Sequence, residues 1–398
     1  MNISSNRRTA RLAAVAVVSA GALLTTTALA LPASAQPQSS HHTLFVRQIA
    51  FGADLHHKYQ ANGKGAWHTE TLTQPDDIST LDGRLYVGFQ NATGPQGEPS
   101  ADGNLDSTIV EFTPHGKEVR QWDVPGHADG VTADPLTGKV IVTVNEDANS
   151  SLFTISAASG HLTHYAYDKP LPHKGGTDAI SFYKKTMLVS ASAPGTTGAA
   201  APKASYPAVY SVTLNQTTKV ATVKPYFYDE AGAKIANNPG GLGTNVKLAL
   251  TDPDSNEVVP STEARWAGDF LLTSQGDKEQ IYSSQPGSLW VLKLSQSVDD
   301  TAFPTSAKGL LFATDPASDT VDSVDGGSWW ESSAFVAVTP CAANNASSSC
   351  TTPNYLGLLN ESTGQITPVT LSGPKLQPQG MTFLATGSTT PPKFPYRS

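Results

Sequence analysis

Asp129-Gly130-Val131-Thr132 belongs to a short pattern that recurs along the chain and governs its architecture. The other clear copies are Asp76-Asp77-Ile78-Ser79, Asp178-Ala179-Ile180-Ser181 and Gln379-Gly380-Met381-Thr382. Each copy has an acid or an amide, then usually a small residue, an aliphatic residue and a hydroxyl-bearing residue. A unit that recurs in this way is typical of repeat architectures.

Three of the copies are followed by a turn and a second β-rich stretch, which is the pattern of a β-hairpin. The turns and the stretches that follow them are Asp82-Gly83 with 85–89, Thr137-Gly138 with 140–144, and Lys184-Lys185 with 187–189. Further β-rich stretches lie downstream of each hairpin. The sequence therefore predicts about four short strands in each repeat.

Two degenerate copies complete the series. Asp322-Ser323-Val324-Asp325 keeps the start of the pattern and precedes the apolar stretch 334–338. Thr251-Asp252-Pro253 matches Ala133-Asp134-Pro135, and this alignment places Lys247 where Asp129 stands. Six starts are then visible, which favours an all-β, six-bladed β-propeller over a sandwich. A seven-bladed ring is the alternative if the long intervals at 183–250 and 254–322 contain another repeat.

The last start, Gln379, is followed by too little chain for a whole blade. Strands expected near 44–49 and 67–72 would complete that blade, so that the ring closes between the two ends of the chain. The repeat resembles that of the secreted six-bladed propellers of the SMP-30/gluconolactonase and NHL-repeat superfamily. The resemblance implies the fold, but the metal-ligand contexts typical of the gluconolactonase branch are absent at the matching positions, so the lactonase activity is not carried over.

Residues 1–35 have the pattern of a secretory signal peptide. Three arginines, Arg7, Arg8 and Arg11, precede an uncharged run from 12 to 31, and small residues lie at Ala33 and Ala35. General secretion is favoured, although the paired arginines leave a twin-arginine route open. Residues 36–398 are then expected to form one secreted propeller domain with a short disordered C-terminal tail.

Composition restricts the possible partners. The net charge is −8, only 15% of the residues are charged, and the 33 glycines and 28 prolines suit strands joined by many turns. An acidic balance disfavours nucleic acid and anionic membranes as partners. No second apolar run has the length of a membrane anchor. The expected product is a soluble, extracellular monomer whose ligand is a small molecule, a carbohydrate or a protein.

Cys341 and Cys350 are the only two cysteines of the chain. They enclose a short polar loop, and two thiols placed in this way in an oxidising compartment usually pair. No histidine flanks either thiol, which disfavours a metal site. The sequence therefore predicts a disulfide bond between them.

The residues that begin the repeats are the candidate functional residues, because the first strand of each propeller blade lines the central channel. The expected ring is Asp76, Asp129, Asp178, Lys247, Asp322 and Gln379. Carboxylates around a narrow channel repel one another, and Ca²⁺ or another divalent metal would relieve that repulsion. The alternative is that these side chains cap backbone amides or hold water, with Lys247 compensating the charge.

Two histidines precede channel-facing repeats. His127 and His173 would lie in loops just before Asp129 and Asp178, where they could bind a transition metal or act as acid–base groups. The alternative for each is an ordinary surface histidine. Catalytic residues are not identifiable, since no serine-hydrolase, zincin or redox motif occurs. The sequence favours a binding propeller, with a metal-dependent hydrolase, lactonase or lyase as the other possibility.

Overall fold

The computed structural model describes residues 43–172, 175–192, 205–237 and 241–386. The expected signal peptide (1–35) and C-terminal tail (387–398) lie outside these ranges, and so does His173. The described residues belong to one compact unit. Its described part is built from β-strands, with two short 3₁₀ turns, η1 (Gly52–Asp54) and η2 (Ala61–Gly63), and contains no α-helix. The predicted all-β class is confirmed.

The strands follow one another as antiparallel neighbours within each group. The first group is β4 (Pro75–Leu81), β5 (Arg84–Phe89), β6 (Asp106–Phe112) and β7 (Glu118–Pro125). The second is β8 (Ala128–Asp134), β9 (Lys139–Val144), β10 (Ser151–Ser156) and β11 (Leu162–Tyr167). The third is β12 (Ile180–Tyr183), β13 (Thr186–Ser190), β14 (Pro207–Asn215) and β15 (Val220–Tyr228). Parallel pairing of β11 with β15 joins the second and third groups into one eight-stranded sheet.

The second half of the chain is less regular. One sheet contains β18 (Pro253–Val258), β19 (Phe270–Ser274), β20 (Glu279–Gln285) and β21 (Ser288–Lys293), extended beyond β21 by β16 (Gly232–Ile235) and β17 (Asn245–Lys247). Another contains β22 (Val298–Ala302), β25 (Ala334–Val338), β26 (Tyr355–Asn360) and β27 (Gln365–Pro368). The chain thus leaves β22, forms β23 and β24 in a neighbouring sheet, and returns to pair β25 with β22.

The ends of the described chain meet in one sheet. Its order is β28 (Leu371–Ser372), β1 (Leu44–Phe51), β24 (Thr320–Asp325), β23 (Gly309–Asp315) and β29 (Met381–Ala385). The strand expected near 44–49 therefore joins the C-terminal strands, as predicted. The strand expected near 67–72 does not, because β3 (Trp67–Thr71) pairs with β2 (His56–Gln60) in a separate hairpin.

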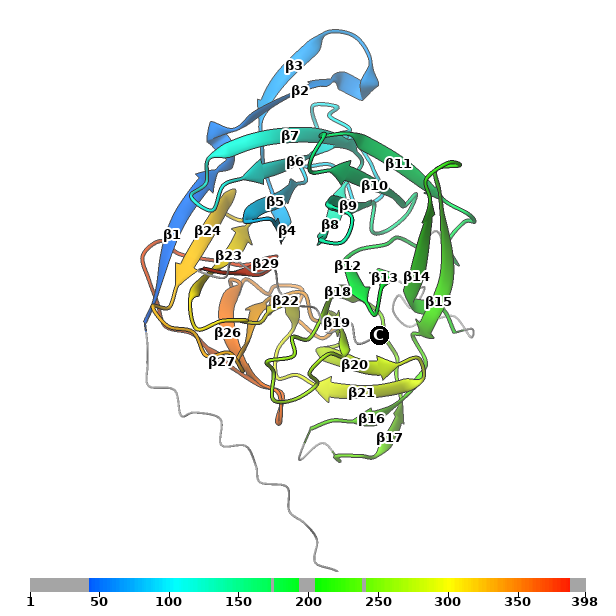
Figure 1. Cartoon of the computed structure of the whole chain (residues 1–398), viewed down its shortest axis with the longest axis vertical. Helices are drawn as coiled ribbons and strands as arrows, with labels where there is room; N and C mark the ends of the chain where they lie inside the picture. Colours follow the sequence, from blue (N-terminus) through cyan, green and yellow to red (C-terminus); the bar gives the residue numbers. More distant parts are fainter. Residues whose placement is uncertain (1–42, 173–174, 193–204, 238–240, 387–398) are drawn as a thin grey trace, which may run out of the picture. The chain divides into compact units, whose positions relative to one another are not determined.

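The sheets have a propeller-like arrangement, with one short strand of each four-stranded group near the centre (Figure 1). These innermost strands are β4, β8, β12, β18, β22 and β29. Hydrogen bonds link each to the next: Val131 N to Asp77 Oδ2, Thr132 Oγ1 to Ile180 O, Asn256 Nδ2 to Ala179 O, Ser255 Oγ to Asp299 O, Met381 N to Asp300 Oδ2, and Gly380 N to Asp76 O.

The hydrophobic core lies between neighbouring sheets. Leu81, Tyr86 and Ile109 of the first group, for example, pack against Val131 and Val142 of the second. Burying such side chains stabilises the fold by about 1.5–3 kcal/mol for each large residue. The apolar side chains of the innermost strands, such as Val131, contribute to this core, and many of their other side chains are polar and line the centre.

The predicted disulfide bond between Cys341 and Cys350 is present. It closes a loop between β25 and β26, two adjacent strands of one sheet. Within the described residues, no helix is long and apolar enough to cross a membrane.

Candidate functional site

A polar cavity of about 360 Å³ lies among the innermost strands. Eleven acidic side chains line it, whereas no lysine or arginine of the described chain does. The acidic residues are Asp76, Asp77, Asp129, Asp134, Glu146, Asp178, Asp252, Asp254, Glu257, Asp299 and Asp300. An uncompensated set of this size makes the cavity strongly attractive to cations.

A β-bulge positions the ring of acids. In four sheets the pairing of the innermost strand is interrupted at the same place, between Pro75 and Ile78, Ala128 and Val131, Pro253 and Asn256, and Val298 and Thr301. The residue after the first member of each pair is an aspartate: Asp76, Asp129, Asp254 and Asp299. Bulges of this kind redirect side chains, often beside active sites.

Four of the six predicted ring residues line the cavity: Asp76, Asp129, Asp178 and Gln379. Lys247 does not, because it lies in β17 at the far edge of its sheet and forms an exposed salt bridge of 2.6 Å with Glu230. The alignment on Thr251-Asp252-Pro253 was wrong, since the register of β18 places Asp254 at the position of Asp129.

Asp322 is the second correction. It lies in β24, a strand inside the sheet that contains β1 and β29, and it accepts a hydrogen bond of 2.6 Å from Thr320 Oγ1. The stretch 334–338, which the Asp322 copy precedes, forms β25 and pairs with β22. Asp299 therefore takes the place predicted for Asp322.

Glutamine amides serve several of the ring carboxyls. Gln90 Nε2 donates to Asp129 Oδ1 at 3.3 Å, Gln275 Nε2 donates to Asp299 Oδ2 at 2.9 Å, and the Gln379 amide donates to Asp76. Gln90 and Gln275 follow the second strands of their sheets, β5 and β19. After the corresponding strand β9, Asn145 takes that position, and the next residue, Glu146, adds a carboxyl whose pKa is raised by the neighbouring Asp178.

His127 is held in one orientation. Its Nδ1 lies 2.6 Å from the carbonyl oxygen of Thr93, which can only accept, so Nδ1 carries the proton. Burial lowers the pKa of His127, which keeps the ring neutral and leaves a lone pair on Nε2. That lone pair points at Asp129 Oδ1, 3.3 Å away.

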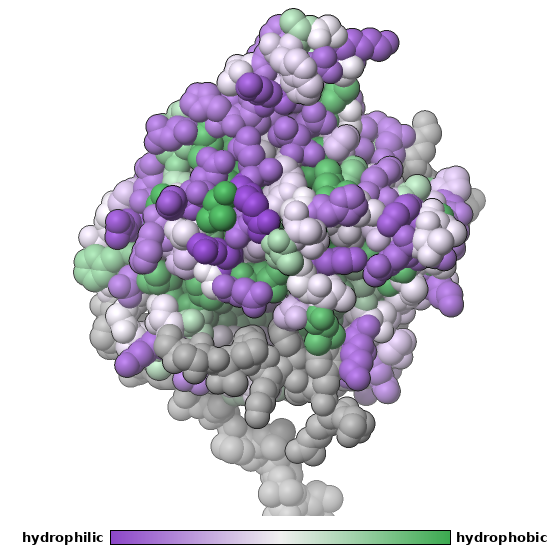
Figure 2. Space-filling view, turned by 45° about the horizontal axis from the view of Figure 1, so that its top comes forward, coloured by the Kyte–Doolittle hydropathy of each residue, from purple (hydrophilic) through white to green (hydrophobic). Residues whose placement is uncertain are grey.

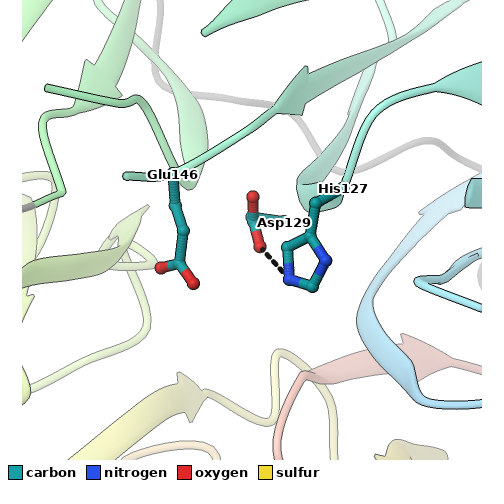
Figure 3. Close-up of side chains that lie close together, drawn as sticks. All are labelled: His127, Asp129 and Glu146. Carbon is teal, nitrogen blue, oxygen red and sulfur yellow. Dashed lines mark ion pairs between the residues drawn. The ribbon is translucent and has the colours of Figure 1, made fainter. Parts of the chain in front are cut away.

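Glu146 completes this group. A nitrogen of His127 and one carboxylate oxygen from each of Asp129 and Glu146 all lie within 4.8 Å of one another. Figure 3 shows the three side chains lying close together, with Asp129 drawn between Glu146 and His127. Asp129 is 4% exposed, and its second oxygen, Oδ2, has no hydrogen-bond partner. The His127 nitrogen and the two carboxylate oxygens are all electron-pair donors. No proton lies between them unless one of the two carboxyls is protonated.

Burial dominates the electrostatics of the ring. It raises the pKa of Asp129 well above its ordinary range, and the neighbouring Glu146 and Asp178 carboxyls add to the effect. It likewise raises the pKa of Glu146 to about 8 and that of Asp299 to about 8, again with a contribution from Asp178. Without a bound cation, several ring carboxyls are therefore protonated at neutral pH.

The side chains of Asp178 and Asp254 lie close enough to hydrogen-bond to each other, a contact that adds to the rise in the pKa of Asp254 and opposes the rise that burial causes in the pKa of Asp178. Two carboxyl groups can do so only when one carries a proton. The pair forms the wall of the cavity next to Glu146.

The residues fit a divalent metal ion. The neutral Nε2 of His127 and the oxygens of Asp129 and Glu146 are suitable donors, and the Nδ1 hydrogen bond to a backbone carbonyl is the outer contact that orients metal-binding histidines. The orphaned Asp129 Oδ2 would gain a partner. A nitrogen donor beside two carboxylates suits a transition metal better than Ca²⁺, which prefers oxygen.

Sequence reasoning identified His127 and Asp129 but missed Glu146, Asp254 and Asp299. Glu146 is outside the repeated pattern, in the loop after β9. Asp254 and Asp299 follow Pro253 and Val298. These two residues can be aligned with Pro75 and Ala128 only when the strand register is known.

No protein-family model and no curated protein matches this sequence. A protein of unknown function from Bacteroides thetaiotaomicron VPI-5482 is similar in structure, with TM-score 0.44 and 9% identity, over 84% of this chain and 65% of that one. This chain thus spans less than two thirds of that protein. A luciferin-regenerating enzyme matches with TM-score 0.33 and 12% identity, over 67% of this chain and 83% of its own. Similarities this weak do not indicate what this chain binds or does.

Proposed function

We propose that the chain is a secreted, monomeric, six-bladed β-propeller that binds a divalent metal ion and a small ligand at one mouth of its central channel. The architecture is supported by six innermost strands linked in a circle of hydrogen bonds. Closure is supported by β1 and β29, which belong to one sheet although they come from opposite ends of the described chain.

The convergence of His127 Nε2 with the carboxyls of Asp129 and Glu146 carries the metal assignment. A bound cation would replace the protons that the buried carboxyls otherwise require. Three protein ligands leave coordination positions free, and the adjoining cavity has room for a ligand that uses them. The surface seen in Figure 2 is mostly hydrophilic, with small scattered hydrophobic patches, which favours a polar ligand over an apolar docking partner on this face.

Metal analysis tests this proposal. The mature protein, purified without chelators or dialysed against Mn²⁺ or Zn²⁺, should retain about one ion per chain. Asp129→Asn and Glu146→Gln should each weaken retention at least tenfold, since each removes a charged ligand. Asp54→Asn, which removes an exposed carboxyl outside the cavity, is the matched control. Equal retention by the ligand variants and the control would refute the site.

A second candidate is a metal-dependent hydrolase, lactonase or lyase. The proton shared by Asp178 and Asp254, next to the metal ligand Glu146, favours it because such a pair can supply and accept a proton. Metal-loaded protein should then turn over a lactone or ester substrate. Asp178→Asn should abolish turnover while metal content is unchanged. If the metal-loaded wild-type protein turns over none of these substrates, the enzymatic function is refuted and the binding function remains.

A further inference from the structure

Two cavity-lining side chains have oxygen atoms without partners, apart from those at the proposed metal site. Ser181 is 7% exposed and Asn256 is 8% exposed, and neither Ser181 Oγ nor Asn256 Oδ1 has a hydrogen-bond partner. The amide of Asn256 cannot be reversed, because its Nδ2 donates to the carbonyl oxygen of Ala179 at 2.6 Å. Buried polar atoms are rarely left unpaired, so these two acceptors point to a ligand that donates hydrogen bonds.

These residues lie further along the innermost strands than the ring of acids. Ser181 is three residues beyond Asp178, and Asn256 is two residues beyond Asp254 on the neighbouring innermost strand. At roughly 3.3 Å per residue, Ser181 lies about 10 Å along its strand from Asp178, and the Asn256 amide, which donates to the carbonyl oxygen of Ala179, lies between the two levels. A single metal ion cannot reach both levels, whereas an elongated organic molecule can.

Carboxyl groups are present at both levels. The Asp178–Asp254 pair lies at the upper level, and Glu257, which also lines the cavity, follows Asn256 directly. No lysine or arginine of the described chain is available in the cavity to receive an anion. Because eleven carboxyl groups line the cavity without a cationic side chain, carboxylate and phosphate ligands are disfavoured.

We infer that the cavity ligand is a small linear diamine, with one ammonium group at the Asp178–Asp254 pair and the other at Ser181, Asn256 and Glu257. The inference rests on the proposed function in taking the cavity as the ligand site. Each ammonium donates three hydrogen bonds and accepts none, which matches a wall of acceptors. The metal site and the diamine site would then occupy different parts of one cavity.

Calorimetric titration with compounds of equal length tests this. The probes are 1,5-diaminopentane, 1,5-pentanediol, glutarate and pentylamine, added to full-length mature protein at pH 7 and low salt. The diamine should bind at least tenfold more tightly than pentylamine, because the second ammonium adds a charged contact. The diol and the diacid should not bind measurably. Binding of glutarate or pentanediol as tight as that of the diamine would overturn the inference.

Two variants locate the site. Asp254→Asn should weaken diamine binding at least tenfold, and Ser181→Ala should weaken it by about three- to tenfold, the usual range for one hydrogen bond. Ser181→Ala loses no internal hydrogen bond, so it should fold normally even if Asp254→Asn does not. Asp54→Asn is the control. Diamine binding that is unchanged in Ser181→Ala and in folded Asp254→Asn would refute the placement.

Metal content measured on the same samples separates the two proposals. A protein that retains metal but does not bind the diamine contradicts the ligand class and leaves the metal site intact. A protein that binds the diamine but retains no metal contradicts the metal assignment and supports the ligand class.

Discussion

Gly130 explains why the second position of the repeated pattern is usually small. A Cβ atom on Gly130 would lie 2.5 Å from the carbonyl oxygen of Asp178 and 2.6 Å from Thr143 Oγ1. Gly380 is confined in the same way, 2.4 Å from the carbonyl oxygen of Asp76. The glycines allow neighbouring innermost strands to approach closely, and this approach brings the ring carboxyls together.

Gly130→Ala should therefore destabilise the protein by about 2–3 kcal/mol, the typical cost of forcing atoms into a packed site. Urea unfolding would measure the loss. Gly232→Ala is the control, because a Cβ there meets no atom within 4 Å and should change stability by less than about 0.5 kcal/mol. Equal effects at the two positions would contradict the steric explanation.

His57 is a buried residue with a structural role that its sequence context does not suggest. It is 1% exposed, and its ring nitrogens lie 2.8 Å from Glu70 Oε1 and 3.1 Å from Asp123 Oδ1. Burial by itself lowers the pKa of His57, but hydrogen bonds and charge from Asp123 and Glu70 outweigh it and raise the pKa above 6.5. The charged ring thus attaches the β2–β3 hairpin to β7.

His57→Gln should destabilise the protein by about 1–3 kcal/mol at pH 6, since it leaves two carboxylates without their cation. The raised folded pKa means that this contribution is complete below the unfolded value near 6.5 and is lost as the pH rises through the folded value. The difference between variant and wild type should therefore shrink at pH 9. His56→Gln, at the exposed neighbouring position, should have little effect at either pH. A pH-independent loss for His57→Gln would show that packing, and not charge, holds the hairpin.

At the scale of the elements, the bulged innermost strand is the unit that builds the site. It places one aspartate of each strand toward the channel, and in β4 and β22 the next residue, Asp77 or Asp300, accepts a backbone hydrogen bond from the following innermost strand. These hydrogen bonds connect neighbouring innermost strands around the cavity, although the strands belong to different sheets.

The loop between β25 and β26 carries the disulfide, and its contribution should be local. Cys341 and Cys350 are 9 residues apart, and closing so short a loop stabilises by about 2–3 kcal/mol in the chain-entropy account. Replacing both cysteines by serine should lower the melting temperature modestly and leave metal binding unchanged. Lost metal binding in a folded double variant would show that the loop reaches the site.

At the scale of the whole molecule, the cavity concentrates charge that folding must accommodate. Burial raises the pKa of Asp77 to about 7 and that of Asp252 to about 6, in addition to the values near 8 for Glu146 and Asp299. Each of these groups binds its proton more tightly in the folded state than in the unfolded chain.

The metal-free protein should therefore lose stability as the pH rises from about 5 to 8. This range lies between the carboxyl pKa values near 4 in the unfolded chain and the raised pKa values in the folded protein. The slope approaches about 1.4 kcal/mol per pH unit for each group that titrates. Saturating Mn²⁺ should make the stability depend less on pH, because the bound ion takes the place of the protons. Urea unfolding at a series of pH values, in EDTA and in Mn²⁺, measures the stability of the metal-free and the metal-bound protein. In the double variant Asp129→Asn with Glu146→Gln, the two stability curves should differ less than in the wild type. A stability that rises with pH in EDTA would contradict the buried-carboxyl explanation.

The all-β class, the hairpins that follow Asp76, Asp129 and Asp178, and the disulfide could be predicted from the sequence, because each depends on residues close together in the chain. It also identified His127 beside Asp129. The fold was needed to show that Asp254 and Asp299, and not Lys247 and Asp322, complete the ring, because strand register and the return from β24 to β25 fix those positions. Glu146 joins the site for the same reason: side chains from separate strands converge only when the bulged strands pack around one cavity.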